Sequence, residues 1–521
     1  MVILMLGVLV GVAGPMSPVP APGRPNIVFI LTDDLDAQLG STDSMPNLNA
    51  LIAGHGATFE NFFVSLSLCC PSRTAILRGQ YAHNTGIYTN RPPEGGFEEV
   101  YARGLEKSTI ATWLQAAGYR TALFGKYLNG YPNGVEPTYV PPGWTEWYSP
   151  AGGNAYGQYH YKLNENGKLV PHGNASEDYL TDVISLKVSD FIQRSVRDGM
   201  SFFAFIPTYA PHGPATPAPR HANLFAGAKA PRPPSFDEAD VSDKPAWNRS
   251  KPELNSAAIQ KMDELYRKRL QSLQAVDELV ASIVQTLETT GQLDNTYIFF
   301  SSDNGFHLGE HRLVSGKNTA FETDLRVPMM ARGPAIAAGT KIQELGVNID
   351  FAPTFAELAG VTPPAEVDGR SLVPPLKGGA ADWRKAFLLE HAGPADESGD
   401  AGASLETGRQ TANKELALLL EPPDDDLLLT GLGRLFGGGG GGPPVFKGIH
   451  TEDYVYVEYR DGERELYDMK ADPNQLSNIY ETADQGLVAK LSAWLAALSN
   501  CAGASCRAAE NSAPSGKTRF H

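Results

Sequence analysis

The run from residue 68 to residue 79 organises the rest of the chain and reads Leu68-Cys69-Cys70-Pro71-Ser72-Arg73-Thr74-Ala75-Ile76-Leu77-Arg78-Gly79. It predicts a short helix, because Pro71 suits a first turn, where its missing N–H is not needed, and Gly79 suits a helix end. The cysteines then lie at the helix N-terminus, where free N–H groups and the helix dipole attract an anion. A thiol in that position is expected to have a lowered pKa and high reactivity. From the spacing alone, a buried structural cysteine pair is the alternative.

On both sides of this helix, the chain alternates continuous apolar runs with helical patterns. The apolar runs predict buried strands at residues 26–31, 119–124, 202–206 and 296–300. The helical patterns cover residues 45–54, 109–117, 179–193 and 259–287. This alternation predicts an α/β domain built on a largely parallel sheet.

Each of these four strands leads into polar or charged residues, namely Asp33 and Asp34, Lys126, His212, and Asp303 with Asn304. In open α/β sheets the site lies at the carboxyl ends of the strands, so we expect these side chains to converge. The three aspartates and the asparagine offer hard oxygen atoms, which suit Ca²⁺ or Mg²⁺ better than zinc. The simpler alternative is that the aspartates cap helices and that residues 303–305 form a turn.

The order of residues in the Cys69 stretch carries a family resemblance. Cys-X-Pro-Ser-Arg followed by Thr-Ala-Ile-Leu-Arg-Gly resembles the signature of type I sulfatases, in which the first cysteine is oxidised to Cα-formylglycine (3-oxoalanine). The doubled cysteine and the run from Gly79 to Asn84 look most like N-acetylglucosamine-6-sulfatases and extracellular heparan 6-O-endosulfatases. The resemblance covers about residues 24–393 and 446–480. It implies an alkaline-phosphatase-like α/β/α sandwich with a smaller C-terminal α+β domain.

The resemblance also implies a role for each residue of the site. The modified residue is Cys69, and a Ca²⁺ ion, or Mg²⁺ in its place, is held by Asp33, Asp34, Cys69, Asp303 and Asn304. The catalytic set comprises Cys69, Arg73, Lys126, His212 and Lys317, of which His212 and Lys317 assist the leaving oxygen. His83, His307 and His311 are candidates for substrate contacts. One departure is Leu128, which stands where many arylsulfatases carry a histidine after the Gly-Lys pair.

The implied reaction is hydrolysis of a sulfate ester by the hydrated aldehyde of formylglycine, in two covalent steps. The expected substrate is a sulfated sugar, and 6-sulfated N-acetylglucosamine is the first candidate. A broad arylsulfatase activity is the alternative. A phosphoester hydrolase on the same fold is a further alternative, but such enzymes usually use zinc with several histidines. A non-catalytic binding protein with an unmodified Cys69 is the alternative from another class. Maturation would require a formylglycine-generating enzyme as partner.

Net charge, an N-terminal apolar run and the cysteines indicate which partners and which compartment to expect for the chain. The formal net charge of −16 over 521 residues argues against nucleic acid or an anionic membrane as a partner. The apolar run from Val2 to Val12 resembles the core of a secretory signal and is too short to span a bilayer, so we expect export without stable membrane insertion. A disulfide between Cys501 and Cys506 would suit an exported protein.

The length predicts more than one domain. We expect a leader at residues 1–24, a catalytic domain at residues 25–392 that runs into the start of the C-terminal domain, and an α+β subdomain at residues 445–500, followed by a tail at residues 501–521. Residues 393–444 contain six consecutive glycines and three consecutive aspartates, which is typical of a disordered insertion. Near the end of the catalytic domain, a strand is expected at residues 347–354 and a short helix at residues 355–359. In the C-terminal subdomain, strands are expected at residues 454–459 and 465–467, and a helix at residues 487–498.

Overall fold

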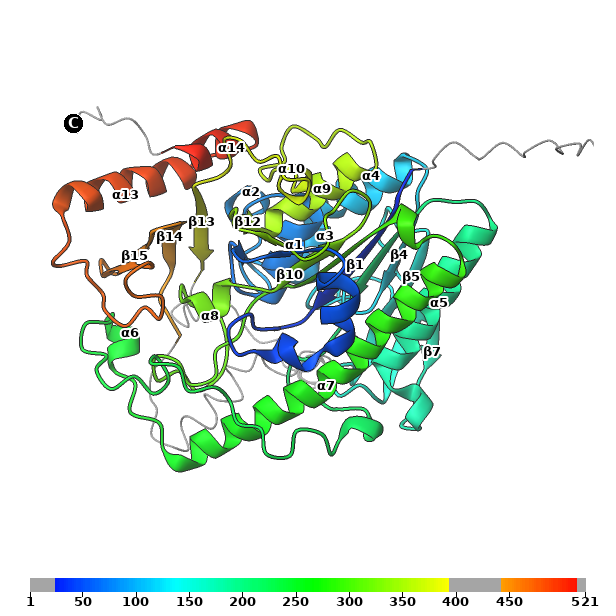
Figure 1. Cartoon of the computed structure of the whole chain (residues 1–521), viewed down its shortest axis with the longest axis horizontal. Coiled ribbons are helices and arrows are strands. Elements are labelled where there is room, and N and C mark those ends of the chain that lie inside the picture. The colour runs from blue at the N-terminus through cyan, green and yellow to red at the C-terminus, as the bar shows by residue number, and fades with distance from the viewer. Residues whose placement is uncertain (1–23, 393–441, 513–521) are drawn as a thin grey trace, which may run out of the picture.

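The computed structural model describes residues 24–392 and 442–512, and in these ranges the largest element is a sheet of ten strands (Figure 1). The expected leader up to residue 23, the expected insertion from residue 393 to 441 and the end of the expected tail lie outside the described residues. From edge to edge, the strands are β11 (Thr340–Ile342), β2 (Ala57–Phe59), β10 (Met329–Arg332), β9 (Thr296–Ser302), β1 (Asn26–Thr32), β8 (Phe202–Pro207), β4 (Arg120–Phe124), β5 (Glu146–Gly153), β6 (Tyr161–Glu165) and β7 (Lys168–Pro171).

The centre of this sheet is parallel and its flanks are mixed. β9, β1, β8, β4 and β5 run parallel to one another, and they include the four strands that the apolar runs predict. Every residue of β1 is buried, because this strand lies between two others and is covered on both faces. On the flanks, β10 runs antiparallel to β9, while β6 is antiparallel to both β5 and β7. The sheet is therefore mixed, and the expected parallel order holds for its centre.

Helices cover both faces of the sheet, as Figure 1 shows. On one face, α1 (Cys69–Arg78), α3 (Gly96–Ala102), α4 (Ile110–Ala116) and α9 (Phe351–Leu358) share an apolar core with Phe29. On the other face, α5 (Leu180–Arg197) and α7 (Ser256–Thr289) share a core with Val28. Consecutive strand residues point to opposite faces, which is why Val28 and Phe29 belong to different cores. The prediction of an α/β/α sandwich is confirmed.

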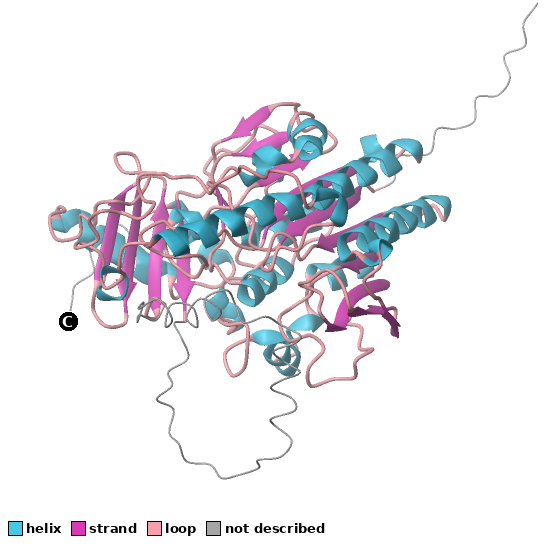
Figure 2. Cartoon of the chain, turned by 90° about the horizontal axis from the view of Figure 1, so that it is seen from below, coloured by secondary structure: helices cyan, strands magenta, loops and turns pink. Residues whose placement is uncertain are grey.

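A second sheet forms the C-terminal domain. It is antiparallel, in the order β13 (Ala386–His391), β14 (Phe446–Thr451), β15 (Tyr454–Tyr459) and β16 (Arg464–Asp468), and α13 (Gln485–Leu498) packs on it. Figure 2 shows its strands gathered near the C-terminal end of the chain, beside the larger sheet. Residues 501–521 were expected to form a tail, but their first part folds. It contains the helix α14 (Ala504–Asn511), in which Cys506 and Glu510 are buried. A disulfide joins Cys501 to Cys506 at the start of this segment.

Two predicted elements differ from the structure. The strand expected at residues 347–354 shrinks to β12 (Gly346–Val347), which pairs with β3 (Phe62–Phe63), and α9 begins at Phe351. The reason is Asp350, whose carboxylate accepts a hydrogen bond from the backbone N of Val347 and so turns the chain into the helix. The helix expected at residues 45–54 is a π-helical turn over Leu48–Ala53. The remaining short helices are α2 (Ala82–Thr85), α6 (Ala246–Arg249), α8 (Glu322–Leu325) and α10 (Val373–Leu376).

None of the helices in the described part of the chain has both the length and the apolar character that a membrane crossing requires.

Candidate active site

The site is built around the first turn of α1. The helix begins at Cys69, so Pro71 lies in its first turn as predicted, and Leu68 precedes the helix in an extended conformation. The backbone N of Cys70 donates to Asn90 Oδ1 at 2.8 Å, which satisfies one of the free N–H groups of the first turn. The helix ends as predicted at Gly79, whose φ of 67° is the left-handed conformation that glycine adopts without strain.

Cys69 is fully buried and lies among charged groups. Its Sγ lies 3.5 Å from Asp33 Oδ1 and 3.9 Å from Asp34 Oδ1, and it accepts a hydrogen bond of 3.0 Å from Lys317 Nζ. Burial raises the pKa of this thiol well above its ordinary value, although Lys126 and Lys317 act in the opposite direction. The lowered pKa expected from the helix N-terminus is therefore wrong, because the removal of water outweighs the favourable charges. In this environment the unmodified residue is a neutral thiol.

The four predicted oxygen donors meet beside Cys69, as expected from the ends of β1 and β9. The backbone N of Asp34 donates to Asp303 Oδ1 at 3.1 Å, and Asn304 Nδ2 donates to Asp34 Oδ1 at 2.7 Å. The exposed fraction of Asp33, Asp34, Asp303 and Asn304 is 0% in each case. Buried carboxylates at this density require cations to compensate them.

Four basic side chains surround these carboxylates. Arg73 Nε contacts Asp303 Oδ2 at 2.8 Å, and Lys126 Nζ contacts Asp33 Oδ2 at 2.8 Å. Lys317 Nζ lies 2.6 Å from Asp34 Oδ1, and His212 Nε2 lies 3.6 Å from Asp34 Oδ2. These contacts bring the predicted catalytic residues together within one buried cluster.

The pKa values of the aspartates follow from these contacts. Burial raises the pKa of Asp33, but Lys126 and Arg73 overcome this effect and hold it well below its usual range. In the same way, Lys317 and His212 outweigh burial and lower the pKa of Asp34. Burial raises the pKa of Asp303 to about 6, and Arg73 only partly offsets it. Negative charge in the cluster is thus held mainly on Asp33 and Asp34.

The donor set fits a hard divalent cation. Asp34 Oδ2 and Asn304 Oδ1 are buried and have no hydrogen-bond partner, which is costly unless another group satisfies them. Ligand atoms of Asp33, Cys69 and Asp303 lie within 4.8 Å of one another, as do those of Asp34, Cys69 and His212. Carboxylate and amide oxygens are the ligands that Ca²⁺ and Mg²⁺ prefer. The residues present therefore fit the ion that the sequence predicts.

The three histidines proposed for substrate contacts lie elsewhere. His83 places its two ring nitrogens 3.1 Å from Glu390 Oε2 and 2.9 Å from the carbonyl oxygen of Cys501, so it joins the catalytic domain to the C-terminal segment. His311 Nδ1 contacts Glu238 at 2.7 Å, and its ring stacks on Phe321. His307 Nδ1 contacts Asp324 Oδ1 at 2.8 Å.

These partners give the histidines structural roles. The backbone of His307 is paired with Gly316, so this residue supports the loop that carries Lys317. None of the three belongs to the lining of the cavity described below. Each of the three histidines thus has a partner within the fold, and its contact with a substrate stays a prediction.

Arg269 is a residue of the site that the sequence reasoning missed. It lies in α7 with an exposed fraction of 0%, and its NH2 group donates to the backbone oxygen of Asp34 at 2.5 Å and to Asp36 Oδ1 at 3.1 Å. Asp34 has a φ of 64°, a left-handed conformation that is strained for a residue other than glycine. Arg269 therefore helps to hold the backbone of a proposed metal ligand. A signal was available, because Arg269 stands at helical spacing between the buried residues Met262 and Leu273.

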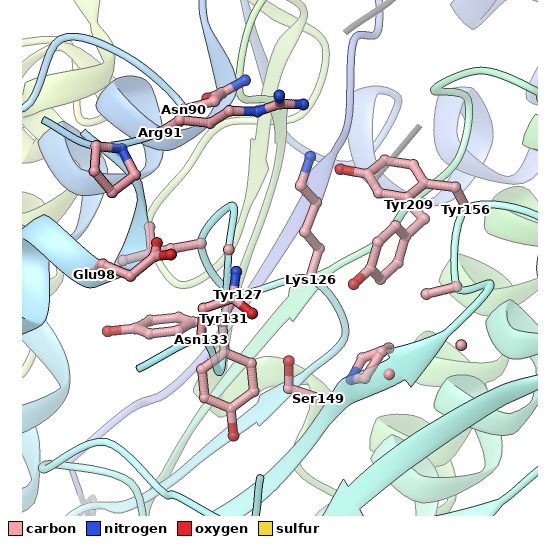
Figure 3. A pocket seen from close by; sticks show the side chains of 17 residues that line it. Asn90, Arg91, Glu98, Lys126, Tyr127, Tyr131, Asn133, Ser149, Tyr156 and Tyr209 are labelled. Carbon is pink, nitrogen blue, oxygen red and sulfur yellow. The ribbon is translucent and has the colours of Figure 1, made fainter. Parts of the chain in front are cut away.

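A cavity of about 320 Å³ opens beside the cluster, and Lys126 belongs to both (Figure 3). Leu128, which stands in the place of the absent histidine, contributes an apolar side chain to its wall. Tyr156 connects the cavity to the cluster, since its ring lies 5.0 Å from Lys126 Nζ and 4.6 Å from the ring of His212. Its lining further includes Asn90, Arg91, Glu98, Tyr127, Gly130, Tyr131, Asn133, Ser149 and Tyr209.

Comparison with known proteins shows the family to which the chain belongs. Residues 25–361 match the family model described as Sulfatase. The chain is 35% identical over 519 residues to N-acetylglucosamine-6-sulfatase from Homo sapiens, which covers 97% of this chain and 90% of the relative. It is 34% identical over 510 residues to an arylsulfatase from Volvox carteri, covering 93% of this chain and 76% of the relative.

A solved structure that is described as a complex with its substrate D-glucosamine-2-N,6-O-disulfate superposes on this chain with a TM-score of 0.69. The two are 26% identical, and the match covers 91% of this chain and 97% of the other. The matched family model spans the Cys69 helix, the pairs Asp33–Asp34 and Asp303–Asn304, and all the basic residues of the cluster. The chain therefore belongs to the Sulfatase family and is a sulfuric ester hydrolase.

Proposed function

We propose that this sulfatase releases inorganic sulfate from sulfated sugars, and that its substrate among them is 6-sulfated N-acetylglucosamine. We also propose that Cys69 carries the reacting group as formylglycine. The observation that carries the proposal is the position of Cys69, which lies in contact with Asp33, Asp34 and Lys317 and close to a cavity of about 320 Å³. A cavity of this size suits one sugar ring. The name of the human relative supports the choice of N-acetylglucosamine 6-sulfate, and the description of the sugar complex supports only the broader class of 6-sulfated glucosamines.

Two groups that the family implies would complete the site. When present, the hydrated aldehyde of formylglycine supplies the hydroxyl group that attacks sulfur. Asp33, Asp34, Asp303 and Asn304, together with the modified Cys69, would hold Ca²⁺, or Mg²⁺ in its place, and such an ion would stabilise negative charge on the sulfate oxygens. The donor set supports this assignment, as do Asp34 Oδ2 and Asn304 Oδ1, which are buried without a hydrogen bond.

The basic residues of the chain would bind the sulfate group and stabilise the transition state. Lys126 and Lys317 approach Cys69 from different segments, so their charges can face the sulfate oxygens as negative charge develops there. Arg73 contacts Asp303 and Asp33, which fixes the two carboxylates in place. In this arrangement the residues are oriented before the substrate binds, and the reaction requires little reorganisation.

We assign the protonation of the departing oxygen to His212. Its Nδ1 lies 2.8 Å from the carbonyl oxygen of Gly213, so Nδ1 must carry a hydrogen in order to donate to this acceptor. Nε2 lies 3.6 Å from Asp34 Oδ2 and is the ring nitrogen that would carry the transferred proton. A sugar hydroxyl is a poor leaving group and requires such a proton.

We further propose that the protein is exported and that a formylglycine-generating enzyme modifies it during maturation. The apolar run from Val2 to Val12 and the disulfide between Cys501 and Cys506 support export, because disulfides persist mainly in oxidising compartments. The Cys69-X-Pro71-Ser72-Arg73 sequence supports the modification.

A broad arylsulfatase activity is the second candidate, and the similarity to the Volvox carteri arylsulfatase favours it. The test is to measure sulfate released from N-acetylglucosamine 6-sulfate and from 4-nitrophenyl sulfate by the same preparation. The proposal predicts efficient release from the sugar. Turnover of the aryl sulfate without release from the sugar would instead establish the second candidate.

A further inference from the structure

We propose that Glu98 is a specificity-determining residue, which makes the site select sugars with a single sulfate and reject those that carry a second sulfate on the far side of the ring. This inference rests on the proposed function, because it assumes that a 6-sulfated sugar occupies the cavity. Glu98 lies in α3 and belongs to the lining of the same cavity as Lys126.

The backbone around Glu98 leaves room for its carboxylate. A Cβ atom built on Gly130 would lie 2.6 Å from Glu98 Oε2, and one built on Gly96 would lie 3.2 Å from the same oxygen. Both glycines have a positive φ, of 84° and 80° respectively. The carboxylate thus occupies a place that side chains at these two positions would restrict.

The charges of the cavity differ from one wall to another (Figure 3). In this view, the ammonium group of Lys126 and the guanidinium group of Arg91 lie toward the same part of the cavity, while the carboxylate of Glu98 enters from another side. Lys126 also contacts Asp33 in the cluster around Cys69, which places the sulfate ester at the Lys126 end. The carboxylate of Glu98 would then face a part of the sugar ring that does not carry the reacting sulfate.

The geometry of a pyranose sugar decides which part that is. A 6-sulfate is carried through carbon 6 on carbon 5, and carbons 2 and 3 lie across the ring from carbon 5. With the sulfate at Lys126, the substituents on carbons 2 and 3 point to the opposite wall, which we assign to Glu98. A carboxylate accepts hydrogen bonds from a hydroxyl group or from the N–H of an acetamido group. It repels a sulfate group at the same place, and this repulsion is strong where water is partly excluded.

The experiment compares two substrates, N-acetylglucosamine 6-sulfate and glucosamine 2-N,6-O-disulfate, in the wild-type enzyme and in Glu98→Gln. Glutamine keeps the shape of the side chain and removes its charge. Glu99→Gln is the matched control, because Glu99 is the next residue of the same helix and pairs with Arg103 at 3.2 Å outside the cavity lining. Glu98→Ala, which removes the carboxyl group entirely, is the second variant, and the melting temperature of each variant reports its folding.

The wild-type enzyme should prefer the monosulfated sugar, with a ratio of kcat/KM values of about 10 or more. Glu98→Gln and Glu98→Ala should lower this ratio by about tenfold, while Glu99→Gln leaves it unchanged. An unchanged ratio in both folded Glu98 variants, with the sugars still hydrolysed, would overturn the inference and leave the proposed function standing. Failure of the wild-type enzyme to hydrolyse either sugar would overturn the proposed function and the inference with it.

Discussion

Cys69 and Cys70 are adjacent in sequence but lie in different surroundings. Cys69 contacts Asp33, Asp34 and Lys317, whereas Cys70 belongs to the apolar core between the helices and the sheet. A helix rotates successive side chains by about 100°, so two neighbouring cysteines cannot face the same site. For this reason we propose Cys69, and not Cys70, as the residue that carries the reacting group.

This difference predicts unequal effects of the two alanine substitutions. Cys69→Ala should reduce sulfate release by at least about 1,000-fold, because the group that attacks sulfur cannot form. Cys70→Ala should keep activity within about tenfold of the wild-type enzyme, since Cys70 belongs to the apolar core and not to the charged cluster around Cys69. The measurement is kcat/KM on N-acetylglucosamine 6-sulfate with folded protein. Equal losses in the two variants would contradict the assignment.

Loss of His212 should lower activity most on substrates whose leaving group requires a proton. His212→Ala should lower kcat/KM for N-acetylglucosamine 6-sulfate by about 100-fold or more, and for 4-nitrophenyl sulfate by less than about tenfold. The nitrophenolate anion leaves without protonation, whereas a sugar alkoxide does not. The two substrates thus control for each other within a single variant. A similar loss on both would show that His212 does not act as the acid.

The positions of site residues that follow a recognisable sequence pattern could be predicted. Properties that depend on burial or on distant partners could not. Asp33, Asp34, Asp303 and Asn304 follow buried strands, so the rule for parallel sheets brings them together. The high pKa of the Cys69 thiol could not be predicted, because it depends on complete burial and not on the helix terminus. The roles of His83 and His311 depend on partners more than 70 positions away along the chain, which a local motif does not reveal.

At the scale of elements, α7 connects the two sides of the site. Arg269 in this helix reaches the backbone of Asp34 at the end of β1, and its NH1 group lies 3.5 Å from the carbonyl oxygen of Pro211, next to His212. The helix was predicted from its apolar spacing, and this prediction is confirmed by α7 over Ser256–Thr289. The role of Arg269 could not be predicted from this spacing, because it depends on how α7 packs against the ends of the strands.

Arg269→Met should weaken the binding of Ca²⁺, because the backbone of Asp34 loses a buried hydrogen bond that holds it in place. We expect the Ca²⁺ concentration that gives half of the full rise in melting temperature to increase by about 10-fold or more. Arg269→Lys should recover part of this effect. Lys268→Met is the control, since Lys268 is the preceding residue of the helix and forms an exposed pair with Glu264. If Arg269→Met binds Ca²⁺ as tightly as the control, the positioning role is wrong.

The elements themselves were predicted unevenly. The central strands have continuous apolar sequences because they are buried on both faces, and they were predicted correctly. The antiparallel strands β6 and β7 were missed, since β7 is only partly buried and its sequence Lys-Leu-Val-Pro resembles a loop. The expected strand at residues 347–354 was wrong because the Asp350 carboxylate accepts from the backbone N of Val347 and closes a 3-10 turn over Asn348–Asp350, after which α9 begins within the apolar run.

At the scale of the whole molecule, buried polar contacts join the two domains. Glu322 in α8 of the catalytic domain contacts His450 Nε2 in β14 at 2.5 Å and Arg326 Nε at 2.7 Å. On the other side, Glu510 in α14 accepts from Tyr81 and from Arg384 Nε. These contacts tie the C-terminal domain to the segments that follow the Cys69 helix. The sequence suggested the existence of the second domain but could not indicate these pairs.

Glu322 should make the stability of the protein depend on pH. Burial raises the pKa of Glu322, but Arg326 and His450 outweigh it and lower that pKa from 4.5 to about 2. A lowered carboxyl pKa contributes stability above pH 4.5, and this contribution is lost as the pH falls toward 2. At pH 7, Glu322→Gln should therefore reduce the free energy of unfolding by about 3 kcal/mol.

The difference between wild type and Glu322→Gln should shrink as the pH falls from 4.5 toward 2, and denaturant unfolding at several pH values measures it. The control is Glu60→Gln, because Glu60 forms an exposed pair with Lys341 and such pairs contribute little. A difference that stays constant between pH 7 and pH 3 would show that the charge of Glu322 is not responsible.

The central claim is that this sulfatase acts through a formylglycine made from Cys69, and the mass of the peptide that contains Cys69 tests it most directly. The measurement uses an enzyme preparation that releases sulfate, produced in cells with a formylglycine-generating enzyme, and digested for mass spectrometry. We expect a peptide about 18 Da lighter than the unmodified sequence, with the change located at Cys69 and not at Cys70. A fully active preparation in which Cys69 remains an unmodified cysteine would contradict the account.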